Sequence, residues 1–174
     1  MISIFGSLSL SLGLGMAAIC ISLFSIFLKN NKYRFFIAGS RAAVVVSVLS
    51  ILATIVLLNE LLVSNFDVNY VAHHTSLETP LLFKITALWA GQAGSLLFWL
   101  FILSIYTLIV IFQYRNSFTN LLPWVIFVMV IVQAFFLILV IFVENPFAPT
   151  IADFQVINGN GLNPLLQNLT MAIH

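Results

Sequence analysis

The sequence predicts an all-α integral membrane protein with about four transmembrane helices, an N-terminus outside, and short interfacial helices in two outer (periplasmic) loops. The first observation is composition: 62% of the 174 residues are hydrophobic and only 6% are charged, against about 25% charged in a soluble domain. The second is a set of long uncharged runs, and the third is the uneven distribution of basic residues. A net charge of +1 excludes a strongly basic nucleic-acid-binding protein.

Four apolar runs are long enough to cross a bilayer, which takes roughly 20 residues at 1.5 Å of rise each. The predicted spans cover about residues 8–28, 42–63, 96–112 and 121–143. Small residues recur at four-residue spacing in the first two spans and predict close helix packing within a bundle. They are Ser9, Gly13, Ala17, Ala43 and Ser47.

The charged residues predict the orientation of these spans. Basic residues gather between spans one and two and between spans three and four: Lys29, Lys32, Arg34, Arg41 and Arg115. Lys84 and all the acidic residues fall on the other side. By the positive-inside rule, the 30–41 loop is cytoplasmic and the N-terminus is outside. Residues 64–95 and 144–174 are then the two outer loops.

The first outer loop contains three local signals. "FDVNYVAHH" alternates apolar and polar residues, which predicts a short strand. "SLETP" predicts a helix start, with Ser76 as the cap and Pro80 early in the helix. The following "LLFKITALWA" is too short to span, which predicts an interfacial or re-entrant helix. Trp89 and Trp99 fit an aromatic belt at the lipid–water boundary.

The stretch "WAGQAGS" predicts a break between this short helix and the third span. Gly91 and Gly94 permit backbone angles and close approaches that other residues resist, and Gln92 and Ser95 can bond the freed backbone groups. Broken backbone at membrane depth survives only where protein or water lines it, so one interpretation turns this break toward the protein interior. The alternative is an exposed loop with tryptophan anchors.

The second outer loop contains a further predicted helix, and the three histidines are candidate metal ligands. Asn163 as a cap and Pro164 in a first turn predict a short helix over "NPLLQNLTMAIH". His73 and His74 are adjacent, so they cannot both face one metal from a regular element. His174 is the last residue of the sequence. The spacings typical of zinc sites and the common nucleophile or phosphate-binding motifs do not occur in the sequence.

Four stretches resemble, in order and spacing, the N-terminal part of the CcmF, CycK and NrfE family of cytochrome c maturation. They are "FDVNYVA" (66–72), "LETPLLFKITALWAGQAGSLLFW" (77–99), "ENPF" (144–147) and "GLNPLLQNLTMAIH" (161–174). Two positions depart from the family pattern. Ala93 stands where family members carry Glu, and "HHTS" replaces a loop rich in Asn and Ser, so no family role passes to His73 or His74.

The resemblance implies haem handling on the outer membrane face and covalent haem attachment to apocytochrome c, as part of a haem lyase complex. His174 matches a family histidine that ligates haem, and a neutral imidazole suits haem iron. Trp89 and Trp99 are hypothesised to shape the wall of the haem region. The implied cofactor is haem b, and the implied partners are a periplasmic haem chaperone, apocytochrome c, membrane lipid and other maturation subunits.

The resemblance also implies a bacterial inner membrane or an organellar inner membrane. The family's tryptophan-rich haem-binding segment is absent, so residues 1–174 are expected to be the N-terminal module of a larger protein or one piece of a split gene, inactive alone. The sequence leaves two alternatives. One is a non-catalytic scaffold module of a haem-export or assembly complex. The other, a transporter subunit, is disfavoured because spans one, three and four bury no ionisable residue, and Glu60 is expected at the outer interface.

Overall fold

The computed structural model describes residues 2–114, 121–150 and 157–167. Within these residues four helices are long and apolar enough to cross a membrane, as predicted. They are α1 (Ile2–Asn30), α2 (Tyr33–Val63), α5 (Gln92–Tyr114), and α6 (Leu122–Ile138) with its π-helical continuation η2 (Leu139–Val143). Pro123 lies in the first turn of α6, where the missing N–H leaves no helical bond unmade.

The first three spanning helices extend further than the predicted spans. The expected 30–41 loop is wrong: α2 already begins at Tyr33, and the connection from α1 is a tight turn with Asn31 at a φ of 50°. Polar and basic residues flanking an apolar run continue the helix outside the hydrocarbon layer, because their backbone groups bond within the helix. Hydropathy marks the apolar part of a helix, not its ends.

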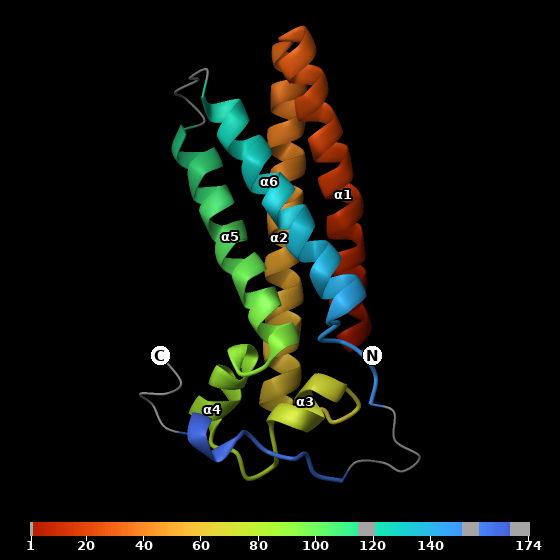
Figure 1. Cartoon of the computed structure of the whole chain (residues 1–174), viewed down its shortest axis with the longest axis vertical. Helices are drawn as coiled ribbons and strands as arrows, with labels where there is room; N and C mark the ends of the chain where they lie inside the picture. The colour runs from red at the N-terminus through yellow and green to blue at the C-terminus, as the bar shows by residue number, and fades with distance from the viewer. Residues whose placement is uncertain (1, 115–120, 151–156, 168–174) are drawn as a thin grey trace.

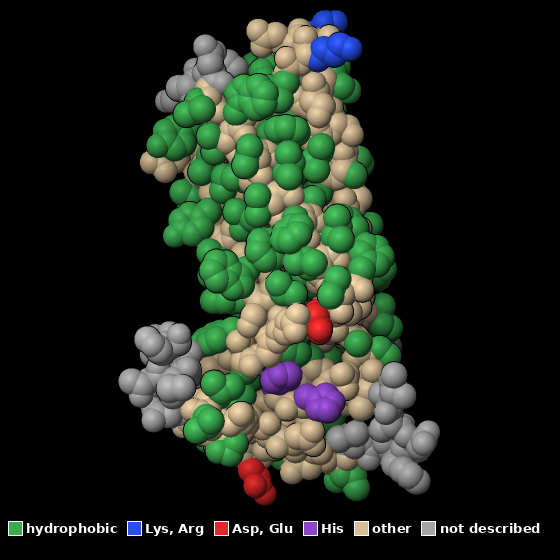
Figure 2. All heavy atoms as spheres, in the orientation of Figure 1, with side chains coloured by type: hydrophobic (Ala, Val, Ile, Leu, Met, Phe, Trp, Pro, Cys, Tyr) green, Lys and Arg blue, Asp and Glu red, His purple; other side chains and the backbone are tan. Residues whose placement is uncertain are grey.

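The four helices form a bundle with a compact, non-spanning part at one end (Figure 1). α1 and α2 lie side by side, α6 packs on both, and α5 packs against α2 and α6 at the edge away from α1. The N-terminus and the short helices α3 (Asn69–His74) and α4 (Leu81–Thr86) lie at the same end. Figure 2 shows apolar side chains over the visible face of the bundle, with basic side chains on this face only at the opposite end.

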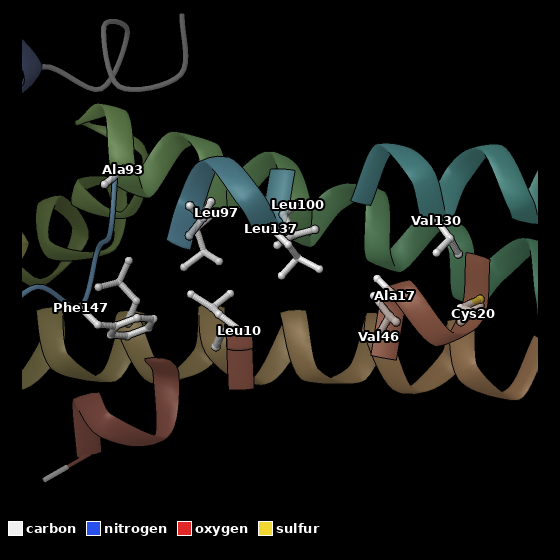
Figure 3. Packing of buried hydrophobic residues seen from close by; sticks show 14 of the residues in the cluster. Leu10, Ala17, Cys20, Val46, Ala93, Leu97, Leu100, Val130, Leu137 and Phe147 are labelled. Atoms are coloured by element: carbon white, nitrogen blue, oxygen red, sulfur yellow. The ribbon is translucent and has the colours of Figure 1, made fainter. Parts of the chain in front are cut away.

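The bundle core is closely packed where small residues were predicted. Gly13 and Ala17 of α1 and Ala43 and Ser47 of α2 are buried. Figure 3 shows leucines of α1, α5 and α6 pointing toward one another between the helices. Small residues let the backbones approach, which is the main route to stable packing where lipid provides no hydrophobic drive.

One polar side chain ties three helices together inside this core. Gln133 of α6 is completely buried. Its Nε2 donates to Thr107 Oγ1 of α5 (3.0 Å) and to Ser47 Oγ of α2 (3.2 Å), and lies 3.4 Å from Ser104 Oγ. Its Oε1 is buried without a partner among the described residues. The side chain therefore fixes the rotation of α6 against α2 and α5.

The non-spanning part, called here the outer unit, consists of residues 64–91, 144–150 and 157–167. The segment before α5 (64–91) and the segment after α6 (144 onward) are joined by an antiparallel bridge between Val68 and Pro149. The Asn69 N–H donates to the Ala148 carbonyl, and the Thr150 N–H to the Asp67 carbonyl, both at 2.9 Å. The two predicted outer loops are thus one packed structure.

The strand predicted for "FDVNYVAHH" is wrong, because residues 69–74 form α3 and only Val68 of this segment is paired, in the bridge with Pro149. Tyr70, Val71 and Ala72 are all buried, so the apparent alternation does not mark two faces of a strand. The carboxyl end of α3 receives backbone donors from the second segment instead: Asn160 N–H bonds the Ala72 carbonyl (2.8 Å) and Gly161 N–H the Thr75 carbonyl (3.1 Å).

Two predicted helix caps in the outer unit have opposite outcomes. Ser76 does not cap α4, because its backbone N–H donates to Thr79 Oγ1 and the helix begins after Pro80. Asn163 does cap the one-turn helix η3 (Pro164–Leu166), its Oδ1 accepting from the Leu165 N–H at 3.0 Å. The remainder of the predicted helix, residues 168–174, lies outside the described residues.

Candidate functional site

The predicted break before the third span is present, and a tyrosine from α3 is built into it. The one-turn helix η1 (Ala87–Trp89) ends there and α5 begins at Gln92. The Tyr70 hydroxyl donates to the Ala87 carbonyl oxygen (2.8 Å) and accepts from the Gly91 N–H (3.1 Å). Burial raises the pKa of Tyr70 well above its ordinary value, so the phenol stays protonated as the donor.

Both glycines of the break are needed for close approach. A Cβ on Gly94 would lie 2.1 Å from the Leu88 carbonyl oxygen and 2.2 Å from the Tyr70 hydroxyl. A Cβ on Gly91 would lie 2.2 Å from His74 Nε2. Ser95 Oγ donates to the Trp89 carbonyl at 2.8 Å, as predicted for a freed backbone group. The break therefore faces protein, and the exposed-loop alternative is wrong.

Tyr70→Phe is expected to lower the free energy of unfolding by about 1–3 kcal/mol, because it leaves the Ala87 carbonyl and the Gly91 N–H without their partner. Thermal unfolding of the purified protein in detergent measures this loss. Tyr114→Phe, on an exposed side chain at the far end of α5, is the matched control and should change little. Equal effects of the two substitutions would contradict the role given to the Tyr70 hydroxyl.

The two described histidines lie together on the surface of the outer unit (Figure 2). His74 stacks on Tyr70, with ring centroids 4.2 Å apart, and its Nδ1–H donates to the Tyr70 carbonyl at 2.8 Å. Burial lowers the pKa of His74, which favours the neutral imidazole. His73 is exposed, and its Nδ1 accepts from Asn160 Nδ2 at 3.2 Å.

Haem iron takes imidazole nitrogens as axial ligands, so the surroundings of the His74 ring nitrogens decide whether it could bind iron. His74 Nδ1 is committed to a backbone carbonyl, and its Nε2 is packed against Gly91. The nitrogen left to ligate iron is Nε2, and in this arrangement it faces Gly91, so no haem role is proposed for His74. His174, the predicted axial ligand, lies outside the described residues.

The two predicted wall residues lie on either side of the break. Trp89 ends η1, is partly buried, and its ring lies 5.3 Å from that of Phe98. Trp99 is inside α5 and 62% exposed. The structure therefore does not bring the two indoles into one described pocket, because Trp99 lies about two helical turns into α5, beyond the break.

Sequence reasoning missed the burial of Glu60. It was expected at the outer interface, but only 1% of its surface is exposed, at the end of α2 where α4 and η1 pack on this helix. Its Oε2 accepts from Asn65 Nδ2 at 2.7 Å, and its Oε1 has no partner among the described residues. Lys84 Nζ of α4 donates to the Oγ of Ser64, a residue that follows Glu60 closely in the sequence. A carboxyl group near the end of an otherwise apolar run was the signal available.

No model of a protein family matches the sequence. The chain is 33% identical over 122 residues to the cytochrome c-type biogenesis protein CcmF of Escherichia coli, a match covering 70% of this chain and 19% of CcmF. It is 31% identical over 169 residues to CycK of Bradyrhizobium diazoefficiens, covering 97% of this chain and 25% of CycK. A solved structure, "Cytochrome c Heme Lyase CcmF", superposes on the whole chain and 27% of its own, with a TM-score of 0.82 at 23% identity.

The fold is that of a multi-pass membrane protein in which a four-helix bundle carries a packed outer unit at one end. The superposition shows that a CcmF protein contains this fold. The chain is related over most of its length to the N-terminal part of the CcmF, CycK and NrfE proteins, which confirms the resemblance read from the sequence. It spans only about a fifth to a quarter of the length of these relatives.

Proposed function

We propose that this chain works in cytochrome c maturation, as the N-terminal membrane module of a haem lyase complex. The observation that carries the proposal is the break between η1 and α5. Residues 77–99, one of the four stretches that resemble the family, are also the stretch whose glycines pack against α3. The relatives are named as cytochrome c-type biogenesis proteins.

We further propose that the outer unit faces the periplasm or the corresponding organellar space, in a bacterial or organellar inner membrane. The basic residues of the α1–α2 connection lie at the opposite end of the bundle, as the positive-inside rule requires. α4 exposes Leu81 (66%) and Leu82 (49%) beside the bundle end. Such an apolar face on a helix too short to span suits the headgroup boundary.

In this proposal haem is the substrate, held on the outer face and passed to apocytochrome c. The haem is of the b type until its vinyl groups form thioether bonds with the two thiols of the apoprotein. His174 supplies an imidazole nitrogen to the iron, and Trp89 and Trp99 form part of the surrounding wall. A periplasmic haem chaperone and other maturation subunits are the expected partners, because residues 1–174 alone lack most of the relatives' length.

His174→Ala tests this proposal in the native, purified complex. The expected result is loss of most of one haem absorbance signal and a lower yield of cytochrome c, because the iron loses an axial ligand. His73→Ala is the matched control: this exposed imidazole should leave both readings unchanged. An unchanged spectrum in the His174 variant would overturn the ligand role and favour the alternative, a non-catalytic scaffold module of a haem-export or assembly complex.

A further inference from the structure

One face of α5 carries a row of hydrogen-bonding side chains that point away from the bundle. The row has heptad spacing and consists of Gln92, Trp99, Tyr106 and Gln113. All four are exposed, Trp99 by 62% and Tyr106 by 58%. The buried residues of the same helix, among them Leu97 and Ser104, form a different face toward α2 and α6. The row is therefore outside the core of this bundle.

The position of Tyr106 does not suit a lipid-facing residue. It lies about 12 Å from the end of α5 at Tyr114 and about 21 Å from its start, at 1.5 Å per residue. Long side chains on a helix point back toward its N-terminus, which carries the phenol toward the middle of the membrane rather than to the nearer boundary. The hydroxyl has no hydrogen bond within the described part of the chain, and hydrocarbon offers none.

Polar groups on other outward faces are accounted for locally. The exposed serines of α1 donate to carbonyls of their own helix, as Ser11 does to Ser7 (2.9 Å) and Ser22 to Ala18 (2.8 Å). A tyrosine cannot do this, because its ring holds the hydroxyl away from the backbone. The outward residues in the middle of α6, such as Val128 and Phe135, are apolar. The row on α5 therefore differs from these faces in the polarity of its side chains, since all of the faces are exposed.

We propose that this face of α5 is covered by another transmembrane helix from outside residues 1–174, which bonds the Tyr106 hydroxyl. A seven-residue repeat is the spacing of helices that cross at about +20° with left-handed packing. The matched CcmF structure is mostly outside the superposed region, since this chain covers 27% of it. The inference does not depend on the proposed function.

The test is photo-cross-linking in native membranes of the full complex. Tyr106 is replaced by p-benzoylphenylalanine, and the cross-linked peptides are identified by mass spectrometry. The expected product joins α5 to an apolar helix outside residues 1–174, in several-fold greater yield than from the same probe at Phe135, which is 55% exposed on α6. A second probe at Ile109, one turn along the same face and 48% exposed, guards against a folding defect at Tyr106.

Three results would overturn the proposal. Cross-links to lipid alone would show that the face is bare. Cross-links from α5 to α5 of a second copy would make the occupant this same chain. Equal protein cross-linking from Phe135 would show that the polar row does not decide where the neighbouring helix lies.

Discussion

Gly94→Ala is expected to destabilise the protein by about 3–5 kcal/mol, a fall of about 10 °C in the unfolding temperature. The added Cβ would lie 2.1 Å from the Leu88 carbonyl oxygen, a backbone atom that cannot swing away, and 2.2 Å from the Tyr70 hydroxyl. Relieving the clash moves η1 away from α5 and breaks the bonds of Tyr70 to the break. The substitution therefore acts on the outer unit and the bundle together.

Gly15→Ala is the matched control for Gly94→Ala. Gly15 lies in the interior of α1 and Gly94 in the first turn of α5, so helix propensity favours alanine by up to about 1 kcal/mol at Gly15 and by less at Gly94. A Cβ on Gly15 would meet nothing within 4 Å, because that face of α1 is open. Thermal unfolding in detergent should show Gly15→Ala unchanged or slightly stabilised. If the two variants unfold at the same temperature, the close approach at Gly94 is not what holds the break.

The spans could be predicted from the sequence because each depends on a local property, the density of apolar side chains. Their ends could not, since residues such as Tyr33 and Arg34 are helical outside the apolar run and hydropathy does not register them. α3 was mistaken for a strand for a different reason. Its burial and its helix end depend on Asn160 and Gly161, which are far along the chain and leave no mark on the sequence around Tyr70.

The candidate site was likewise predictable only in part from the sequence. Two glycines in a short polar stretch predicted a break but left open whether it faces protein or is an exposed loop. The partner of the break, Tyr70, could not be found, since nothing in a single sequence pairs it with Gly91. Gln133 did carry a signal, as an amide within an apolar run, but an uncharged amide does not by itself indicate which neighbouring helix it bonds.

The outer unit and the bundle are coupled through the start of α5. Tyr70 of α3 bonds Ala87 and Gly91, just before α5 begins. Leu97 and Leu100 of α5 enter the bundle core seen in Figure 3. A displacement of α3 would therefore be transmitted to the first turns of α5. Because α5 is held in rotation by Gln133 further along, the break and the buried amide together decide which face of α5 points outward.

Gln133→Ala is expected to lower the free energy of unfolding by about 2–4 kcal/mol. The amide bonds Thr107 and Ser47, and hydrogen bonds between membrane helices contribute about 0.6 kcal/mol each on average. The larger part comes from the cavity, because alanine leaves the space of a fully buried side chain empty among three helices.

Gln133→Leu separates these two contributions in the Gln133→Ala result. Leucine fills most of the space and removes the unpartnered Oε1 together with the bonds, so we expect a loss of only about 1 kcal/mol. Thr107 and Ser104 keep hydroxyl acceptors in their own helix, the Leu103 and Leu100 carbonyls at 2.8 Å, and are not left as unpaired donors. Unfolding in detergent should rank the wild type above the leucine variant and the alanine variant last. If the leucine variant loses as much stability as the alanine variant, the amide bonds rather than the packing hold α6 in place, because both variants lack these bonds and only leucine fills the space.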